Sequence, residues 1–143
     1  MTEVNVSVSL PCSPEKAWAT VSDLNRFEEW LTIHQGWRGE IPAEINVGSK
    51  ITEVVSVMGM ANKIEWNVDE YDEPRSLKIS GTGMAGVKVS FTLSVKLEGD
   101  TTVTSIDAEF TGQMIVGPIG AAVGKSTKAE LEKSLATLAE LVG

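Results

Sequence analysis

The chain has 143 residues, which fits a single domain with one hydrophobic core. Its 20 acidic and 12 basic residues give a formal charge of −8, and Lys and Arg form no run, so a surface that binds nucleic acid through its phosphates is not expected. Cys12 is the single cysteine, which excludes an intrachain disulfide and a thiolate metal cluster within these residues.

The N-terminal stretch does not have the pattern of a signal peptide. Polar and apolar residues alternate there, where a signal peptide would have a charged region followed by an apolar one. No apolar run approaches the ~18 residues that a membrane-spanning helix needs. We therefore expect an unprocessed cytoplasmic protein with no stable membrane insertion.

The first segments predict a strand followed by two short helices. Residues 4–10 alternate apolar and polar side chains, as a strand with one buried face does. Ser13 as an N-cap with Pro14 at the first helical position predicts a short helix. Asn25, followed three residues later by Glu28, repeats the capping pattern and predicts a second one.

The middle of the chain is rich in strand patterns. Residues 32–45 have no clear period and contain Gly and Pro, so we expect a loop with a short edge strand. Five further segments have strand patterns, and turn residues separate them: 49–58, 63–72, 77–82, 87–97 and 102–111. Their short spacings favour an antiparallel meander.

The last segment, residues 117–142, predicts a glycine-spaced lead-in and then a long helix. An apolar stripe recurs at spacings of four, three and four: Leu131, Leu135, Leu138 and Val142. Thr127 with Glu130 fits another capping box, in which case the helix would kink or restart near Ser126. Burying the stripe calls for a curved antiparallel sheet that wraps the helix, so we expect an α+β fold.

Two glycine-rich motifs are interpreted as structural. Residues 81–86 match G-x-G-x-x-G, but a strong strand pattern follows where a dinucleotide site needs a helix, so a hairpin turn is expected. Residues 120–126 (GAAVGKS) are one residue short of a phosphate-binding loop. We expect no cofactor.

Two ionisable residues are weak catalytic candidates. His34 is the single histidine, so it would have to serve in any imidazole chemistry, although a lone histidine in such a loop is more often a structural or mildly polar pocket residue than a catalyst. Glu53 shares a strand face with Ile51 and Val55, which points it inward unless a bulge turns it outward. No cluster of metal-ligand residues accompanies them, so no metal is expected.

Large apolar residues are spread over the segments that should meet between the sheet and the helix. Taken singly, each is typical of a packed core. Together, flexible Met and flat Trp side chains are what a deformable apolar cavity requires.

The N-terminal third of the chain resembles a known family. Residues 14–18 (PEKAW), 21–23 (VSD) and 27–30 (FEEW) are similar to the opening of the polyketide cyclase/dehydrase and lipid-transport branch of the START-like superfamily, also called SRPBCC or Bet v 1-like. Residues 22–42 (SDLNRFEEWLTIHQGWRGEIP) are similar to small mycobacterial-type members, some of which are described as toxins of toxin–antitoxin modules. The resemblance extends over the whole chain and implies the helix-grip fold, with two short helices after the first strand.

The resemblance also implies a deep apolar cavity between the sheet and the last helix. By position, the cavity candidates are Trp30, Ile33, His34, Trp37, Met58, Trp66, Met84, Phe91, Phe110 and Met114. The expected function is binding of a small hydrophobic ligand, such as a lipid, a polyketide-like molecule or an isoprenoid. The alternatives are a toxin that acts through a protein partner, or a cofactor-free polyketide cyclase or dehydratase that uses His34. A homodimer through an exposed sheet edge also stays open.

Overall fold

A computed structural model of the chain describes residues 2–41, 45–57, 59–83, 86–113 and 115–142. In chain order the elements are β1 (Thr2–Leu10), α1 (Pro14–Val21), the 3₁₀ turn η1 (Leu24–Arg26), α2 (Phe27–Trp30), β2 (His34–Arg38), β3 (Lys50–Val57), β4 (Met60–Asp72), β5 (Ser76–Thr82), β6 (Lys88–Glu98), β7 (Thr101–Thr111) and α3 (Gly117–Val142).

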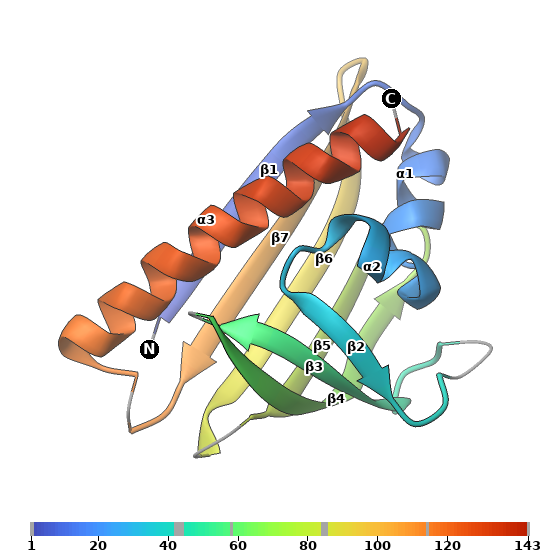
Figure 1. The fold of residues 1–143 in the computed structure, drawn as a ribbon. Coiled ribbons are helices and arrows are strands. Elements are labelled where there is room, and N and C mark those ends of the chain that lie inside the picture. Colours follow the sequence, from blue (N-terminus) through green and yellow to red (C-terminus); the bar gives the residue numbers. More distant parts are fainter. Residues whose placement is uncertain (1, 42–44, 58, 84–85, 114, 143) are drawn as a thin grey trace.

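The strands form one antiparallel sheet that curves around α3. The strand order is β1-β7-β6-β5-β4-β3-β2, so every neighbour in the sheet is a neighbour in sequence except for β1 beside β7. Figure 1 shows α3 lying along the concave side of the sheet, with α1 and α2 near its C-terminal end. This arrangement confirms the expected α+β helix-grip fold.

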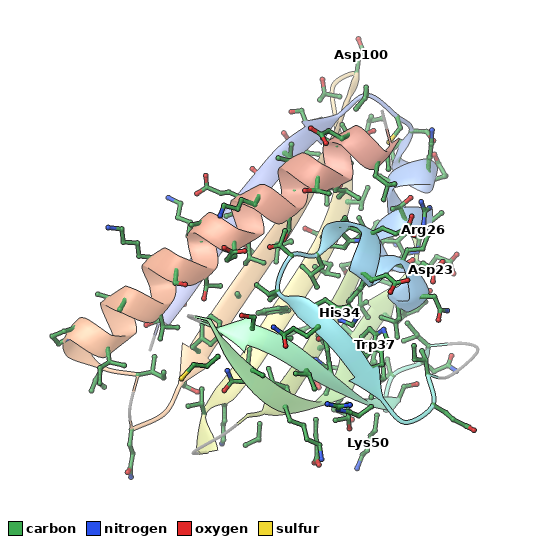
Figure 2. The ribbon with its side chains drawn as sticks, viewed as in Figure 1. Asp23, Arg26, His34, Trp37, Lys50 and Asp100 are labelled. Atoms are coloured by element: carbon green, nitrogen blue, oxygen red, sulfur yellow. The ribbon has the colours of Figure 1, made fainter. Side chains whose placement is uncertain are left out.

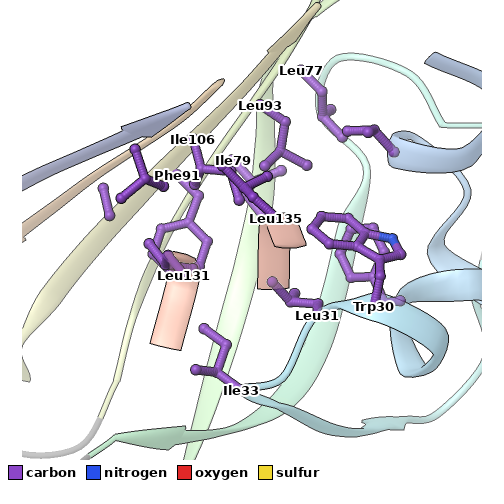
Figure 3. Packing of buried hydrophobic residues seen from close by; sticks show 14 of the residues in the cluster. Trp30, Leu31, Ile33, Leu77, Ile79, Phe91, Leu93, Ile106, Leu131 and Leu135 are labelled. Carbon is purple, nitrogen blue, oxygen red and sulfur yellow. The ribbon is translucent and has the colours of Figure 1, made fainter. Parts of the chain in front are cut away.

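The C-terminal half of α3 holds the core together. Leu131, Leu135 and Leu138 are at most 2% exposed, so the predicted stripe is buried. It faces the apolar side chains of the sheet, among them Phe91 and Ile106 (Figure 3). Each such leucine contributes roughly 1.5–3 kcal/mol of burial free energy, which fixes α3 firmly at this end.

The N-terminal half of α3 is helical from Gly117, so the expected kink or restart near Ser126 is wrong. The glycines here serve close packing against β1. Thr2 Oγ1 donates to the carbonyl oxygen of Gly120 at 3.1 Å, and a Cβ atom at Gly124 would lie 2.9 Å from Thr2 Cγ2. Small residues therefore let the helix cross the edge strand, which local pattern alone could not show.

The N-terminal helices follow their caps, with one correction. Ser13 accepts a hydrogen bond from the Lys16 amide at 3.3 Å, as expected for the first helix. The expected cap at Asn25 is wrong: Asp23, whose carboxylate accepts from the Asn25 amide at 3.0 Å, caps η1, and α2 follows with Arg26 at its N-cap and no side-chain cap hydrogen bond. Asp is as good an N-cap as Asn. Because a 3₁₀ turn precedes α2, the helical region starts earlier in the chain than the sequence indicated.

The strand boundaries agree with the sequence to within a few residues. The largest shift is at β4, which begins at Met60 because Gly59, with φ of +79°, closes a tight turn after β3. The G-x-G-x-x-G motif begins inside β5, and β6 begins at Lys88, two residues after the motif ends, which leaves no room for the helix that a dinucleotide site needs. Nor does any described helix combine the length and apolar character that crossing a membrane requires.

Candidate functional site

A cavity of about 260 Å³ lies between the N-terminal half of α3 and the concave face of the sheet. Strands β3, β4, β6 and β7 and the segment before β2 supply its other walls. Most of the described side chains that line it are apolar: Ile33, Val55, Met60, Ile64, Val87, Val89, Phe91, Phe110, Ile115, Ile119 and Val123. Concave, largely apolar spaces with a few polar groups are typical of small-molecule sites.

The cavity exists because α3 changes its inward side chains along its length. Its C-terminal half presents leucines to the sheet, whereas its N-terminal half presents Val123 and Thr127, which are shorter. On the sheet side, Gly83 and Val87 are also small where they border the space. The volume that these residues leave unfilled is the cavity.

The mouth of the cavity has an apolar rim. Met60, the first residue of β4, is 64% exposed, and Ile119, in the first turns of α3, is 52% exposed. Both line the cavity and both reach solvent. A hydrophobic molecule entering here would meet apolar contacts before it left water.

Both walls of the cavity include polar residues: Ser56 and Asn62 on the sheet, and Ser126, Thr127 and Glu130 on α3, where the last three make up what we call the polar side of the cavity. Asn62 is engaged, because its Nδ2 donates to the Met60 carbonyl oxygen at 2.9 Å. Thr127 is 5% exposed, and its hydroxyl has no hydrogen-bond partner among the described residues. Polar groups of this kind orient a ligand that apolar surface alone would hold loosely.

Glu130 is held in place at the edge of the cavity. Its Oε2 accepts a hydrogen bond from Thr32 Oγ1 at 2.9 Å, and the Thr32 amide donates to Ser134 Oγ, also at 2.9 Å. These contacts tie the segment between α2 and β2 to α3. These contacts fix one wall of the cavity and hold the Glu130 carboxylate on its polar side.

His34 and Glu53 form a buried pair behind the cavity wall. Their side chains are 4% and 2% exposed, and His34 Nδ1 is hydrogen-bonded to Glu53 Oε2. The other carboxylate oxygen accepts from Trp66 Nε1 at 2.8 Å. Glu53 points inward because β3 pairs with β4 without a break along its length, whereas the register shift lies in β2, between His34 and Gly36.

Aromatic rings surround this pair. The His34 ring lies 4.9 Å from the Trp37 ring and 6.0 Å from the Phe27 ring, centroid to centroid. Figure 2 shows His34 and Trp37 on β2. Trp37 Nε1 donates to the Leu24 carbonyl oxygen at 3.0 Å, which ties β2 to η1. The described part of the chain contains no group of three or more His, Cys, Asp or Glu side chains that could hold a metal.

The structure divides the cavity candidates into three groups. Ile33, Phe91 and Phe110 line the cavity. Four do not line it and pack in the core or around the buried pair beside it: Trp30, His34, Trp37 and Trp66. Met58, Met84 and Met114 lie outside the described residues.

The candidates named from the sequence include no residue of α3, although α3 supplies one wall of the cavity. Val123 and Thr127 continue the buried stripe toward the N-terminus at spacings of four, and both are buried. Extending the stripe backward from Leu131 would have found them. The glycines around them concealed this signal, because they suggested a flexible lead-in in place of a helix.

Comparison with known proteins gives matches over the whole chain. The family model described as "Polyketide cyclase / dehydrase and lipid transport" matches residues 1–143. A Mycobacterium tuberculosis protein is 37% identical over 143 residues, covering 100% of both chains. A second protein from that organism, named as a toxin, is 36% identical over 135 residues and covers 94% of each chain.

Solved structures share the fold. A START superfamily protein from Mycobacterium smegmatis superposes with a TM-score of 0.74 at 22% identity, covering 100% of both chains. A protein from Thermus thermophilus superposes with a TM-score of 0.78 at 20% identity, covering 98% of this chain and 96% of the other. At these identities the likeness shows the fold alone.

Proposed function

Because the chain belongs to the polyketide cyclase/dehydrase and lipid transport family, we propose that it binds a small hydrophobic molecule in the cavity between α3 and the sheet. The observation that carries the proposal is the cavity itself, about 260 Å³ of space with mostly apolar walls and an apolar rim. A lipid fragment, a polyketide-like aromatic and an isoprenoid are the ligand classes that fit such walls.

Apolar burial supplies the affinity in this proposal. A ligand about as large as a tryptophan side chain buries roughly 200 Å². At ~25 cal/mol per Å² this burial contributes about 5 kcal/mol, which corresponds to a dissociation constant of about 0.2 mM before any polar contact is counted. The polar side of the cavity would add affinity and fix the orientation of the ligand.

We propose binding and not catalysis because the two ionisable candidates lie outside the lining of the cavity. His34 and Glu53 are hydrogen-bonded to each other, and neither lines the cavity. A general acid or base must come within hydrogen-bond reach of its substrate. A cofactor-free cyclase or dehydratase that uses His34 would need this pair to separate and turn toward the cavity.

Native mass spectrometry of the purified protein tests the proposal, followed by extraction and identification of any bound molecule. Val123→Phe places a large side chain in the cavity, and Glu132→Phe places the same side chain on the exposed face of α3. We expect a defined adduct on the wild-type protein and on Glu132→Phe, and its loss from Val123→Phe. An adduct retained by Val123→Phe, or no adduct and no stabilisation by a panel of lipids and aromatics, would contradict the proposal.

A second candidate is a toxin that acts through a protein partner. The observation that favours it is the name of the relative that is 36% identical over 135 residues. Expression of this chain alone from an inducible promoter should then arrest growth, and an antitoxin encoded beside it should relieve the arrest. Normal growth at high expression would count against this candidate and leave the binding proposal untouched.

A further inference from the structure

The inference begins with Thr127, whose hydroxyl is unusual for a helix. Several hydroxyls in the helices donate to the carbonyl oxygen four residues earlier, as Thr137 does to Lys133 at 2.9 Å and Ser134 does to Glu130 at 2.9 Å. Thr127 makes no such bond and has no other partner among the described residues, although it is 95% buried and lines the cavity. The hydroxyl oxygen itself is not fully buried, so a group inside the cavity that Thr127 lines can reach it as a partner.

The charge of the cavity restricts what that group can be. Glu130 is the one charged residue among the described lining residues, and its carboxylate lies one helical turn after Thr127. No cation is among the described lining residues: Lys133, whose side chain is mostly exposed, pairs through Nζ with Glu130 Oε1 at 3.4 Å, and Lys125 and Lys128 line a separate groove between α3 and β1. An anionic ligand would therefore lose its hydration in the cavity with no lining cation to compensate its charge, which is unfavourable.

The volume restricts the size of the ligand. An apolar cavity of ~150 Å³ holds benzene, so about 260 Å³ has room for a body of roughly two fused rings or an equally compact aliphatic skeleton. A long acyl chain would extend beyond this space through the mouth at Met60 and Ile119.

We infer that the ligand is a compact, neutral molecule with one hydroxyl group, a phenol or an alcohol, whose hydroxyl is hydrogen-bonded to Thr127 Oγ1 on the polar side of the cavity. The ligand hydroxyl is a donor and an acceptor, so it bonds to Thr127 in either direction; where Thr127 donates, the single proton of the ligand hydroxyl is left for the neighbouring Glu130 carboxylate. This inference rests on the proposed function, because it assumes that the cavity is the binding site.

The test uses three probes with the same ring system: naphthalene, 2-naphthol and 2-naphthoate. Binding is measured by equilibrium dialysis against the wild-type protein and the variants, with circular dichroism to show that each is folded. We expect 2-naphthol to bind about five- to tenfold more tightly than naphthalene, the gain that one good hydrogen bond gives. The anion 2-naphthoate should bind more weakly than naphthalene.

Variants of Thr127 test whether its hydroxyl is the source of the tighter binding of 2-naphthol. Thr127→Val keeps the shape and removes the hydroxyl, so the preference for 2-naphthol should fall to about one while naphthalene still binds. Thr127→Ser keeps the hydroxyl and should retain the preference, as should Thr137→Val, the matched change elsewhere on α3.

Each result has a distinct meaning. If the preference for 2-naphthol survives in Thr127→Val, or if 2-naphthoate binds as tightly as 2-naphthol, the inference is overturned and the cavity proposal stands. If naphthalene and 2-naphthol both fail to bind the wild-type protein, the cavity proposal is overturned and the inference with it.

Discussion

The buried carboxylate of Glu53 gives a sharp prediction about stability. Glu53→Ala removes the partner of His34 Nδ1 and of Trp66 Nε1, two donors in a region where the three side chains are almost fully buried. Breaking a buried polar network from one side costs about 3–5 kcal/mol, because the remaining groups lose both their partner and water. Against a typical total stability of 5–15 kcal/mol, this loss is large.

Urea denaturation followed by circular dichroism measures the effect. Glu53→Gln keeps the shape and one acceptor oxygen, so it should cost clearly less than Glu53→Ala. Glu65→Ala, on an exposed position of the neighbouring strand β4, should stay within about 0.5 kcal/mol of the wild type. If Glu53→Ala also stayed within 1 kcal/mol, Glu53 would not be the buried, doubly bonded group described here.

Three further predictions concern single sites. Thr104→Val should raise the stability by about 1 kcal/mol in urea denaturation, because Thr104 is fully buried and its hydroxyl has no partner among the described residues; a loss would show that a partner exists. Gly81→Ala should lower the melting temperature by at least about 8 °C, because its Cβ would collide with the Glu65 carbonyl oxygen in the adjacent strand. An unchanged melting temperature would mean that the two strands can separate there at no cost in free energy. Burial, and next the charge of Glu73, raise the pKa of Tyr71 above its ordinary value of 10.0. Stability that is present below pH 10 should therefore be lost as the pH rises through the higher pKa of the folded state. Absorbance titration of this single tyrosine measures the pKa, and a midpoint at or below 10 would refute the prediction.

The sequence predicted the fold well because the fold depends on periodicity. The alternation in residues 87–97 and 102–111 reappears as β6 and β7, and the leucines of α3 are buried as a stripe. These patterns show which face of each element is buried. Burying the apolar faces of all the elements together requires a sheet that wraps around a helix. The cap at Asp23 was missed because several residues in that stretch could cap, and local sequence does not choose among them.

The location of the cavity was predictable from the sequence, but the residues that line it were not. Large aromatic residues attract attention in a sequence, and Trp30, Trp37 and Trp66 were expected to line it. In the structure they fill space beside it, as large side chains do. A cavity forms where small residues meet, here near Val87 and Val123, and no local pattern marks a volume that several distant segments fail to fill.

The central claim is that the cavity between α3 and the sheet holds a small hydrophobic molecule. Methyl NMR spectra of the protein titrated with 2-naphthol test it most directly, because they report where binding occurs. The account predicts shifts of the methyl signals of Val89 and Val123, which line the cavity, with little change at Leu77 in the packed core or at exposed Leu97. Shifts confined to exposed methyls such as that of Leu97, or no saturable shifts at millimolar probe, would contradict it.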